Sequence, residues 1–404
     1  MRISSLNLKI ISGGVILAIA VGIRQSFGLF LEPISLDLNL GRESFALTIG
    51  LVNLLWGICA PFTGAISDKY GTGKVVLCGA MFYCLGLYLI GMADNETNLL
   101  FGGILIGIGL SGLGFTVILG AIGRAVPKNK RGTALGLASM GGSIGMFAAI
   151  PMAGKLIQDY SWSIALLTMV IMAAIIVPFA YGIRGKSNIS TKDKQVENPQ
   201  SVIEALKEAM THRNFILLTI GFFICGFHVN FIVTHLPAYL SDLSFDSSVA
   251  TTALALVGLA NIFGVIIAGK IGDHMEKSKA LVYFYSLRSI VFIIYVALPI
   301  TPISTLIFTF TLGLLWLGTV PLTSGLVAAF FGVRYMSMLY GIVFLSHQIG
   351  GFASSWLGGY LYDISGNYNL MWGISIFLGL FAASIHYPIR ECAVVRKAQS
   401  TQSI

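Results

Sequence analysis

Long apolar stretches, separated by short polar ones, run through almost the whole chain. A helix needs about 20 apolar residues to cross a bilayer, and the pattern predicts twelve such spans. The predicted spans are 9–31, 44–66, 75–93, 98–121, 133–156, 162–183, 214–237, 250–271, 280–299, 303–327, 337–360 and 370–389. We therefore expect an all-α membrane protein embedded in the lipid bilayer.

The composition supports this prediction. The chain has 404 residues, of which 56% are hydrophobic and only 10% are charged, whereas a soluble domain carries about 25% charged residues. The first span is too long for a cleaved signal peptide, and no small-residue cleavage site follows it. The five cysteines show no paired spacing, so we interpret them as apolar filler.

The positive charges predict the orientation. If alternate loops are assigned to the cytoplasm, starting with the N-terminus, 21 of the 25 Lys and Arg fall on the cytoplasmic side and only Arg42 and Lys155 in outer loops. This is the positive-inside bias of membrane proteins. The net charge of +8 is therefore a topology signal and does not indicate nucleic-acid binding. We expect a multi-pass protein of the plasma membrane (the inner membrane of a bacterium) with both termini in the cytoplasm.

The longest polar stretch, 184–213, divides the chain into two sets of six spans. Within it, 201–210 has apolar residues on one face and predicts a short amphipathic helix on the membrane surface. The predicted units are an N-terminal half at 1–183, a cytoplasmic linker at 184–213, a C-terminal half at 214–390 and a cytoplasmic tail at 391–404.

The two halves repeat at an offset of 205 residues. Gly64-x-x-x-Asp68 reappears as Gly269-x-x-x-Asp273, and three glycines of span five reappear in span eleven. Those glycine pairs are Gly136 and Gly341, Gly145 and Gly350, and Gly154 and Gly359. Five matches at one offset predict duplicated six-helix halves, an arrangement in which the substrate site lies between the halves at mid-depth.

The loop after span two reads Gly64-Ala-Ile-Ser-Asp68-Lys69-Tyr-Gly71-Thr-Gly73-Lys74. It resembles the signature of the major facilitator superfamily, Gly-x-x-x-Asp-[Arg/Lys]-x-Gly followed by basic residues. The resemblance implies a conformational latch, in which Asp68 caps a neighbouring helix and Lys69 and Lys74 pair across the cytoplasmic face. Gly269 and Asp273 form a degenerate second copy, because His274 stands where a basic residue is expected.

Within that superfamily the chain resembles the bacterial branch of the monocarboxylate transporter family, over nearly its whole length. The residues that carry this resemblance are Gly22-Ile-Arg24-Gln25-Ser26-Phe27-Gly28, Cys225-Gly-Phe-His228-Val-Asn230-Phe231, His235-Leu-Pro237-Ala-Tyr239, Trp316-Leu-Gly-Thr319-Val-Pro321-Leu-Thr323-Ser324-Gly325 and Ser346-His347-Gln348-Ile-Gly350-Gly351. Animal members carry a Lys where Gln25 stands and an Asp/Arg pair in span eight, where this chain has only Asn261. Their substrate and proton coupling therefore do not carry over directly.

Two buried charges stand out, and both are cations. All 17 Asp and Glu fall in loops or at span ends, whereas Arg24 and Arg288 lie inside spans one and nine. Placing a charge inside a bilayer costs free energy, and such residues are usually functional. Unpaired cations therefore indicate an anionic ligand. Arg24 is the first candidate, although it could instead snorkel to the outer headgroups or bond to helix carbonyls. Arg288 either contacts the substrate or bonds to carbonyls of adjacent helices.

The repeat offset suggests which residues share the cavity with Arg24. Position 24 corresponds to 229, between His228 and Asn230, and Ser143 corresponds to Gln348. A membrane histidine can also be a simple helix–helix hydrogen bond. The candidate binding residues are Arg24, Gln25, His228, Asn230, His235, His347 and Gln348, followed by Asn53, Trp56, Ser143, Asn261, Trp316 and Thr319, which core packing could also explain. Ligand spacing for a metal is absent, and no cofactor is implied.

These observations predict a secondary transporter of a small organic anion, most simply a monocarboxylate, working as a monomer by alternating access. Protons are a second candidate partner, since proton symport and anion exchange both fit. Drug or metabolite efflux is the alternative, although a buried carboxylate would be expected for cationic drugs. A membrane-embedded enzyme needs a nucleophile with a positioned acid or base, which the pattern lacks, and a sensor would be favoured by an extra soluble domain.

Overall fold

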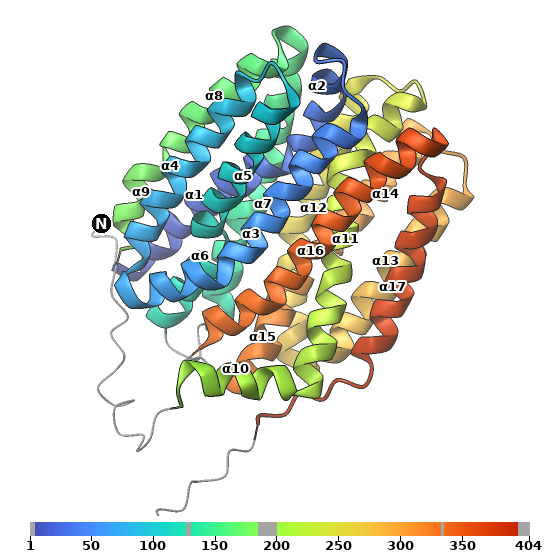
Figure 1. The fold of residues 1–404 in the computed structure, drawn as a ribbon. Helices are drawn as coiled ribbons and strands as arrows, with labels where there is room; N and C mark the ends of the chain where they lie inside the picture. Colours follow the sequence, from blue (N-terminus) through green and yellow to red (C-terminus); the bar gives the residue numbers. More distant parts are fainter. Residues whose placement is uncertain (1–4, 127–130, 185–199, 333–334, 395–404) are drawn as a thin grey trace, which may run out of the picture.

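The computed structural model describes residues 5–126, 131–184, 200–332 and 335–394, and helices dominate this region (Figure 1). The elements of the first half are α1 (Ser5–Gln25), the 3-10 helix η1 (Phe27–Phe30), α2 (Leu31–Asp37), α3 (Arg42–Tyr70), α4 (Thr72–Gly91), α5 (Glu96–Leu113), α6 (Phe115–Ala125), α7 (Arg131–Asp159), α8 (Trp162–Ala174) and α9 (Ile176–Gly182). Those that follow are α10 (Val202–Thr211), α11 (Arg213–Asp242), α12 (Ser247–His274), α13 (Lys277–Ala297), α14 (Pro302–Leu314), α15 (Thr319–Phe331), α16 (Met336–Ser365) and α17 (Asn369–His386).

Eleven helical stretches within the described residues are long and apolar enough to cross a membrane. The 30-residue helix α16 stands where the remaining span is predicted. The structure therefore confirms the predicted all-α membrane fold with two halves of six spans. The span ends differ from the prediction most at the first span, which continues through η1 and α2 to Asp37.

Spans four and ten were predicted as continuous helices, but each is broken. The first break is at Gly114, between α5 and α6, and the second is at 315–318, between α14 and α15. Gly114 is required at its position, because a Cβ there would lie 2.6 Å from Nε1 of Trp56. The hydropathy of both segments is continuous across the break, so the apolar pattern could not reveal it.

The repeat in the sequence appears as equivalent helix contacts. A Cβ on Gly145 of α7 would lie 1.8 Å from the carbonyl oxygen of Ala18 in α1. At the same offset of 205 residues, a Cβ on Gly350 of α16 would lie 2.0 Å from the carbonyl oxygen of Phe223 in α11. These glycines allow the paired backbones to touch, as small residues do between membrane helices.

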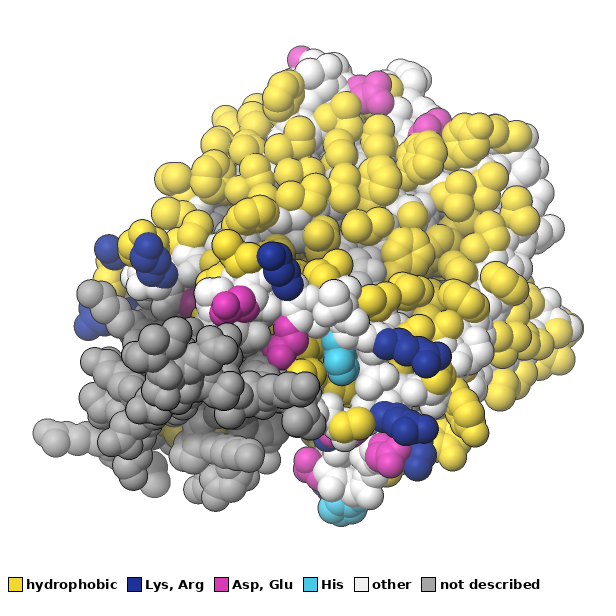
Figure 2. Space-filling view, turned by 60° about the horizontal axis from the view of Figure 1, so that its bottom comes forward, with side chains coloured by type: hydrophobic (Ala, Val, Ile, Leu, Met, Phe, Trp, Pro, Cys, Tyr) yellow, Lys and Arg dark blue, Asp and Glu magenta, His cyan; other side chains and the backbone are white. Residues whose placement is uncertain are grey.

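The short helix predicted in the linker is present as α10, at one end of the bundle (Figure 1). It begins with a capping box, in which Ser201 and Glu204 bond to each other's backbone N–H groups. Lys and Arg side chains surround this end, and the flank above it is hydrophobic (Figure 2). We call it the α10 end, and the opposite end of the bundle, where α2 lies, the α2 end.

Candidate functional site

A cavity lies between the two halves, where α1, α3 and α6 meet α11 and α16. Its volume is about 30 Å³, which is room for about two water molecules. Seven of the predicted binding residues line it: Arg24, Gln25, Asn53, Trp56, Asn230, His347 and Gln348.

Arg24 organises the polar wall of this cavity. It occupies the last turn of α1, where the helix dipole favours a cation, and its side chain is buried. Its Nη2 donates hydrogen bonds to Oδ1 of Asn53 (2.7 Å) and to Oδ1 of Asn230 (2.8 Å). Nδ2 of Asn53 also donates to Oδ1 of Asn230, at 2.9 Å. Because Asn230 belongs to α11, this cluster joins the two halves.

The cavity is rich in unpaired donors. Nε and Nη1 of Arg24, Nε1 of Trp56 and Nε2 of Gln348 are buried without a hydrogen-bond partner among the described residues. The side-chain oxygens of Asn53, Asn230 and Gln348, in contrast, already accept hydrogen bonds. A buried donor without a partner costs about 1–3 kcal/mol. The cavity is therefore suited to a ligand that supplies hydrogen-bond acceptor oxygens.

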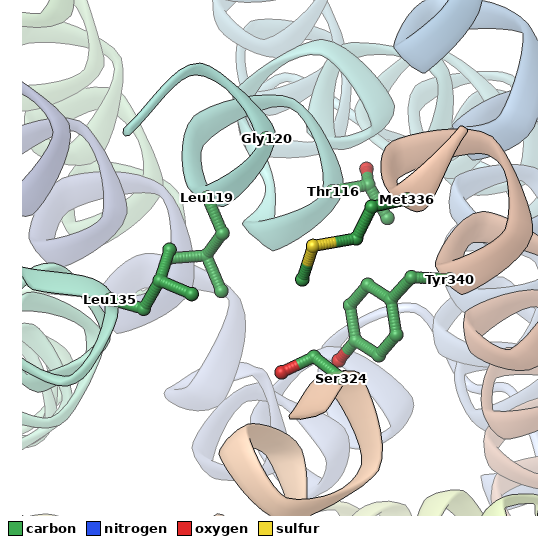
Figure 3. Close-up of a pocket in the computed structure, with 7 residues that line it drawn as sticks. All are labelled: Thr116, Leu119, Gly120, Leu135, Ser324, Met336 and Tyr340. Carbon is green, nitrogen blue, oxygen red and sulfur yellow. The ribbon is translucent and has the colours of Figure 1, made fainter. Parts of the chain in front are cut away.

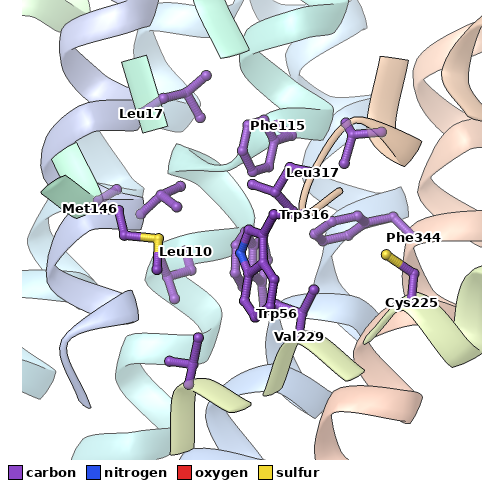
Figure 4. Packing of buried hydrophobic residues seen from close by; sticks show 14 of the residues in the cluster. Leu17, Trp56, Leu110, Phe115, Met146, Cys225, Val229, Trp316, Leu317 and Phe344 are labelled. Atoms are coloured by element: carbon purple, nitrogen blue, oxygen red, sulfur yellow. The ribbon is translucent and has the colours of Figure 1, made fainter. Parts of the chain in front are cut away.

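Apolar side chains form the rest of the wall. Trp56 of α3 meets Phe344 of α16 edge to face, with ring centroids 5.2 Å apart. Phe115, which follows the first helix break, and Leu317, which lies within the second, are beside them (Figure 4). An apolar wall with a few polar anchors is typical of sites for small ligands.

His228 does not share this cavity, contrary to the prediction. Its Nε2 lies 2.7 Å from the carbonyl oxygen of Ser375 in α17, and its ring packs against Phe292 of α13. The physical reason is helical geometry, because two residues along a helix turn through about 200°. With Asn230 facing the cavity, His228 must face the other way.

His235 is likewise held among helices of the second half. Its Nε2 lies 2.7 Å from the carbonyl oxygen of Ser355, and its Nδ1 lies 3.2 Å from the hydroxyl of Tyr368. Both ring nitrogens are therefore engaged in helix packing, and the residue is not part of the cavity lining.

Replacing His228 with alanine is expected to lower stability by about 1–3 kcal/mol, because it leaves a void and removes the hydrogen bond to Ser375. The affinity for the transported ligand is expected to stay unchanged. Thermal unfolding and ligand binding of the purified variant check this, with the exposed His274→Ala as control. A stable His228→Ala protein that had lost ligand affinity would contradict the placement.

The second buried cation, Arg288, supports a helix break. Its Nη2 donates to the carbonyl oxygens of Leu315 (2.6 Å) and Trp316 (2.7 Å), and its Nη1 lies 3.7 Å from Sγ of Cys225. These carbonyls lie in the break after α14, outside the regular helix. The contacts of Arg288 therefore agree with the second alternative, in which it bonds to carbonyls of an adjacent helix.

Four lower-ranked candidates lie behind the cavity wall. Nδ2 of Asn261 donates to Oγ of Ser143 at 2.7 Å, and its Oδ1 accepts from the backbone N–H of Leu317 in the second break. Ser143 therefore pairs with Asn261, whereas Gln348, its counterpart in the repeat, lines the cavity. Thr319 contacts Cys225 at 3.2 Å, and Trp316 is completely buried.

The signature loop is built around an ion pair within the first half. Asp68, near the end of α3, accepts a hydrogen bond from Arg124 in the last turn of α6, instead of capping a helix N-terminus. Gly71 adopts φ +101°, a conformation that favours glycine. Lys69 lies over the ring of Tyr70, and Lys74 is exposed. In the second copy, Gly269 is half-buried and Asp273 is exposed.

A polar seal, which the sequence pattern did not reveal, joins the halves at the α2 end. Arg42 of α3 makes two hydrogen bonds to the carboxylate of Asp242 at the end of α11, at 2.9 and 2.8 Å. Close by, Nε1 of Trp356 donates to Glu43, and the backbone N–H of Glu43 donates to Asp363. These residues fall at span ends, where hydropathy does not indicate contacts between helices. Among them, Arg42 alone stood out in the sequence, because it is a basic residue in an outer loop.

The other ion pairs between described residues do not join the two halves: one lies within the first half, one within the second, and one links Lys277 to Glu391 of the tail. Towards the α10 end a small hollow of about 10 Å³ lies between α6 and α7 of one half and α15 and α16 of the other, lined by Thr116, Leu119, Ser324 and Tyr340 among others (Figure 3). Polar bonds therefore join the halves at the α2 end, whereas towards the α10 end a small hollow remains between them.

A bundle of apolar spans in two repeated halves, with a donor-lined cavity between them, defines a multi-pass membrane transporter. The sequence profile of the Major Facilitator Superfamily matches residues 12–355, and the chain belongs to this superfamily. It is a transporter and not an enzyme.

Relatives cover most of the chain at low identity. Monocarboxylate transporter 13 of Rattus norvegicus is 27% identical over 364 residues, covering 87% of this chain and 81% of the relative. The uncharacterized MFS-type transporter YcxA of Bacillus subtilis is 24% identical and covers 89% of each chain. The sialic acid transporter NanX of Escherichia coli is 25% identical, covering 80% of this chain and 78% of the relative.

Proposed function

We propose that this protein is a secondary active transporter of a small organic anion, with a monocarboxylate as the first candidate, and that it works as a monomer by alternating access. The observation that carries this proposal is the state of Arg24. It is a buried cation that lines the cavity, and its hydrogen bonds to described residues go to amide oxygens. Its Nε and Nη1 have no hydrogen-bond partner among these residues. No Asp or Glu is among the residues that line the described cavity, so a bound anion would supply the missing counter-charge.

The names of two relatives support the same substrate class. One is a monocarboxylate transporter and the other a sialic acid transporter, and both kinds of substrate carry a carboxylate. The identities of 27% and 25% leave the particular anion open, and the lining of the cavity is therefore the stronger argument for a carboxylate.

The geometry suggests how the anion would act on the cluster. A bidentate carboxylate takes two neighbouring N–H groups of a guanidinium, and each such pair includes Nη2. Because Nη2 of Arg24 is bonded to Asn53 and Asn230, the anion would displace at least one amide oxygen. Displacing Asn230 would release a bond between the halves, which links anion binding to the movement of one half against the other.

We infer further that the α10 end faces the cytoplasm, since Lys and Arg gather there (Figure 2). The protein would lie in the plasma membrane with both termini on the cytoplasmic side, and the halves at 1–183 and 214–390 would rock about the cavity. In this orientation the polar bonds between the halves lie at the outer end, and the small hollow lies on the inner side. The transport cycle then requires the bonds at the α2 end to break.

A thermal-shift screen of the purified protein against small carboxylates tests this function, because a ligand that binds the folded state raises the unfolding temperature. Matched amines and neutral amides serve as controls. Counterflow of the best labelled carboxylate in liposomes then tests transport. Stabilisation by amines without any by carboxylates would contradict the proposal and favour efflux of cations.

Asp68→Asn is expected to change the transport rate several-fold while changing substrate affinity less than about threefold, since the Asp68–Arg124 pair lies towards the α10 end, away from the cavity. The matched control is Asp273→Asn, which alters the exposed counterpart in the second half. Rates and affinities from liposome uptake check this. Equal effects of the two variants would argue against a latch at Asp68.

A further inference from the structure

We propose that the hollow towards the α10 end is a second binding subsite for the transported anion, where hydroxyl groups bind the carboxylate once it has left Arg24. These hydroxyl groups belong to Thr116, Ser324 and Tyr340. The inference rests on the proposed function and deepens it, because it names the next place at which the anion binds between Arg24 and the α10 end.

The hollow lies one helical turn away from the cavity. On α15, Val320 lines the cavity and Ser324 lines the hollow. On α16, Phe344 lines the cavity and Tyr340 lines the hollow. In both helices the two residues are four apart, which corresponds to about 6 Å along the helix axis. The two voids are therefore stacked along the same helices.

The offset of 205 residues places both voids on the axis that relates the halves. Residues related by the repeat stand on opposite sides of this axis, so a void lined by both members of a pair lies on it. The pairs are Leu119 with Ser324 and Leu135 with Tyr340 in the hollow, and Arg24 with Val229, Gln25 with Asn230 and Phe115 with Val320 in the cavity. An anion that moves along the axis from Arg24 towards the α10 end therefore passes through the hollow.

The two halves contribute different chemistry to the hollow. The first half presents Leu119 and Leu135, and the second half presents the hydroxyl groups of Ser324 and Tyr340 at the equivalent positions (Figure 3). The hydroxyls of Tyr340 and Thr116 have no hydrogen-bond partner among the described residues, although these side chains are only 3% and 1% exposed. An unpaired buried hydroxyl costs free energy. The hollow is therefore suited to a ligand that carries acceptor oxygens.

A carboxylate with a small apolar group fits this lining. Hydroxyl groups donate short hydrogen bonds to a carboxylate, and the leucines and Met336 can contact the apolar group. Ser324 donates at 3.2 Å to the carbonyl oxygen of Pro321, and rotation of its hydroxyl can exchange this bond for one to the ligand. A metal cation would need about six or more oxygen ligands, which exceeds the three hydroxyls of the described lining.

The size and charge of the hollow make it a transient site. Its volume is about 10 Å³, which is room for about one water molecule. A carboxylate can therefore enter only when α6 and α7 move away from α15 and α16. No Lys or Arg is among the described residues that line the hollow, so binding there should be weaker than at Arg24.

The first test compares transport with affinity in the full-length protein. The double variant Thr116→Val, Tyr340→Phe removes two hydroxyls and nearly keeps the side-chain volumes. Liposome uptake of small monocarboxylates, from acetate to benzoate, should fall about tenfold, while affinity from thermal shifts should stay within about twofold because Arg24 is unchanged. The control Ser35→Ala removes another buried hydroxyl without a described partner, in α2, and should transport like the wild type.

The second test detects a ligand in the hollow. Leu119→Cys places a thiol in its wall, on a background in which the exposed Cys78 and Cys392 are replaced by serine. A small thiol reagent added from the α10 side should react more slowly with benzoate present, and benzamide should have no such effect. Adding Thr116→Val and Tyr340→Phe should abolish this protection, although benzoate still binds at Arg24.

Three outcomes would overturn the inference. Wild-type uptake by a well-folded double variant would do so and leave the proposed function standing. Protection of Leu119→Cys that persists without the hydroxyls would mean that binding at Arg24 closes the hollow indirectly. If no monocarboxylate stabilises the wild type or protects Leu119→Cys, the proposed function and this inference fail together. Should the double variant not fold, Tyr340→Phe alone gives the same test, with an expected loss of about threefold in uptake.

Discussion

Replacing Arg24 with glutamine is expected to abolish binding and uptake of the anion while the protein still folds. Glutamine keeps a polar group that can bond to Asn53 and Asn230, but it removes the charge. Hydrogen bonds between charged groups contribute about 1.5–3 kcal/mol each, so the loss of two should weaken binding at least about 100-fold, or ~2.7 kcal/mol. Arg24→Lys keeps the charge and loses the planar fork, and an intermediate loss of about tenfold is expected.

Arg288→Lys is the matched control, because it changes the other buried arginine. Arg288 bonds to the carbonyls of Leu315 and Trp316, so this variant should lower the unfolding temperature and leave affinity within about threefold. Ligand titration and thermal unfolding of all three variants separate the two roles. A well-folded Arg24→Gln protein with wild-type uptake would refute an anion site at Arg24.

Breaking the seal at the α2 end is expected to shift the protein towards a conformation that is open at that end. Arg42 and Asp242 form a two-bond ion pair between the halves, and the hydroxyl of Tyr362 also donates to Asp242. Both side chains are partly buried, at 14% and 29% exposure. Asp242→Asn should therefore raise the equilibrium constant for opening at the α2 end about tenfold, which corresponds to ~1.4 kcal/mol.

Cysteine labelling reports this shift. Val229→Cys places a thiol in the cavity lining, on a background in which the exposed Cys78 and Cys392 are replaced by serine. A membrane-impermeant maleimide added from the α2 side should react faster when Asp242→Asn is also present. Swapping the charges of Arg42 and Asp242 should restore slow labelling.

The control for the seal is Glu276→Gln, which removes an ion pair whose side chains are 64% and 53% exposed. Such surface pairs contribute little, and no change in labelling is expected. Unchanged labelling in Asp242→Asn as well would mean that other contacts hold this end closed, such as the bond between Trp356 and Glu43.

The polar cluster could be predicted in part from the sequence. Arg24 was conspicuous as a buried cation, and the offset of 205 residues pointed to position 229 in the other half. The structure places Asn230 against Arg24 but turns His228 away. An offset along the chain gives depth in the membrane, whereas the direction of a side chain depends on the rotation of its helix about its axis. That rotation is set by packing with α16 and α17.

The helix breaks and the polar seal could not be predicted from the sequence for a related reason. Gly114 lies inside a continuous apolar run, and the need for glycine arises from Trp56 on another helix. Arg42 and Asp242 are 200 residues apart, and each alone is an ordinary charge at a span end. Their pairing depends on how two distant helix ends meet.

By itself, the sequence determined that the chain inserts in a bilayer as about twelve helices in two repeated halves, because the cost of exposing polar groups to lipid acts on each segment locally. It also determined that a cation is buried at Arg24. Only the tertiary structure decided which amides surround that cation, which of the histidines reaches the cavity and which end of the bundle is sealed. These features depend on the rotation and meeting of helices that are far apart in the chain, and no local pattern encodes them.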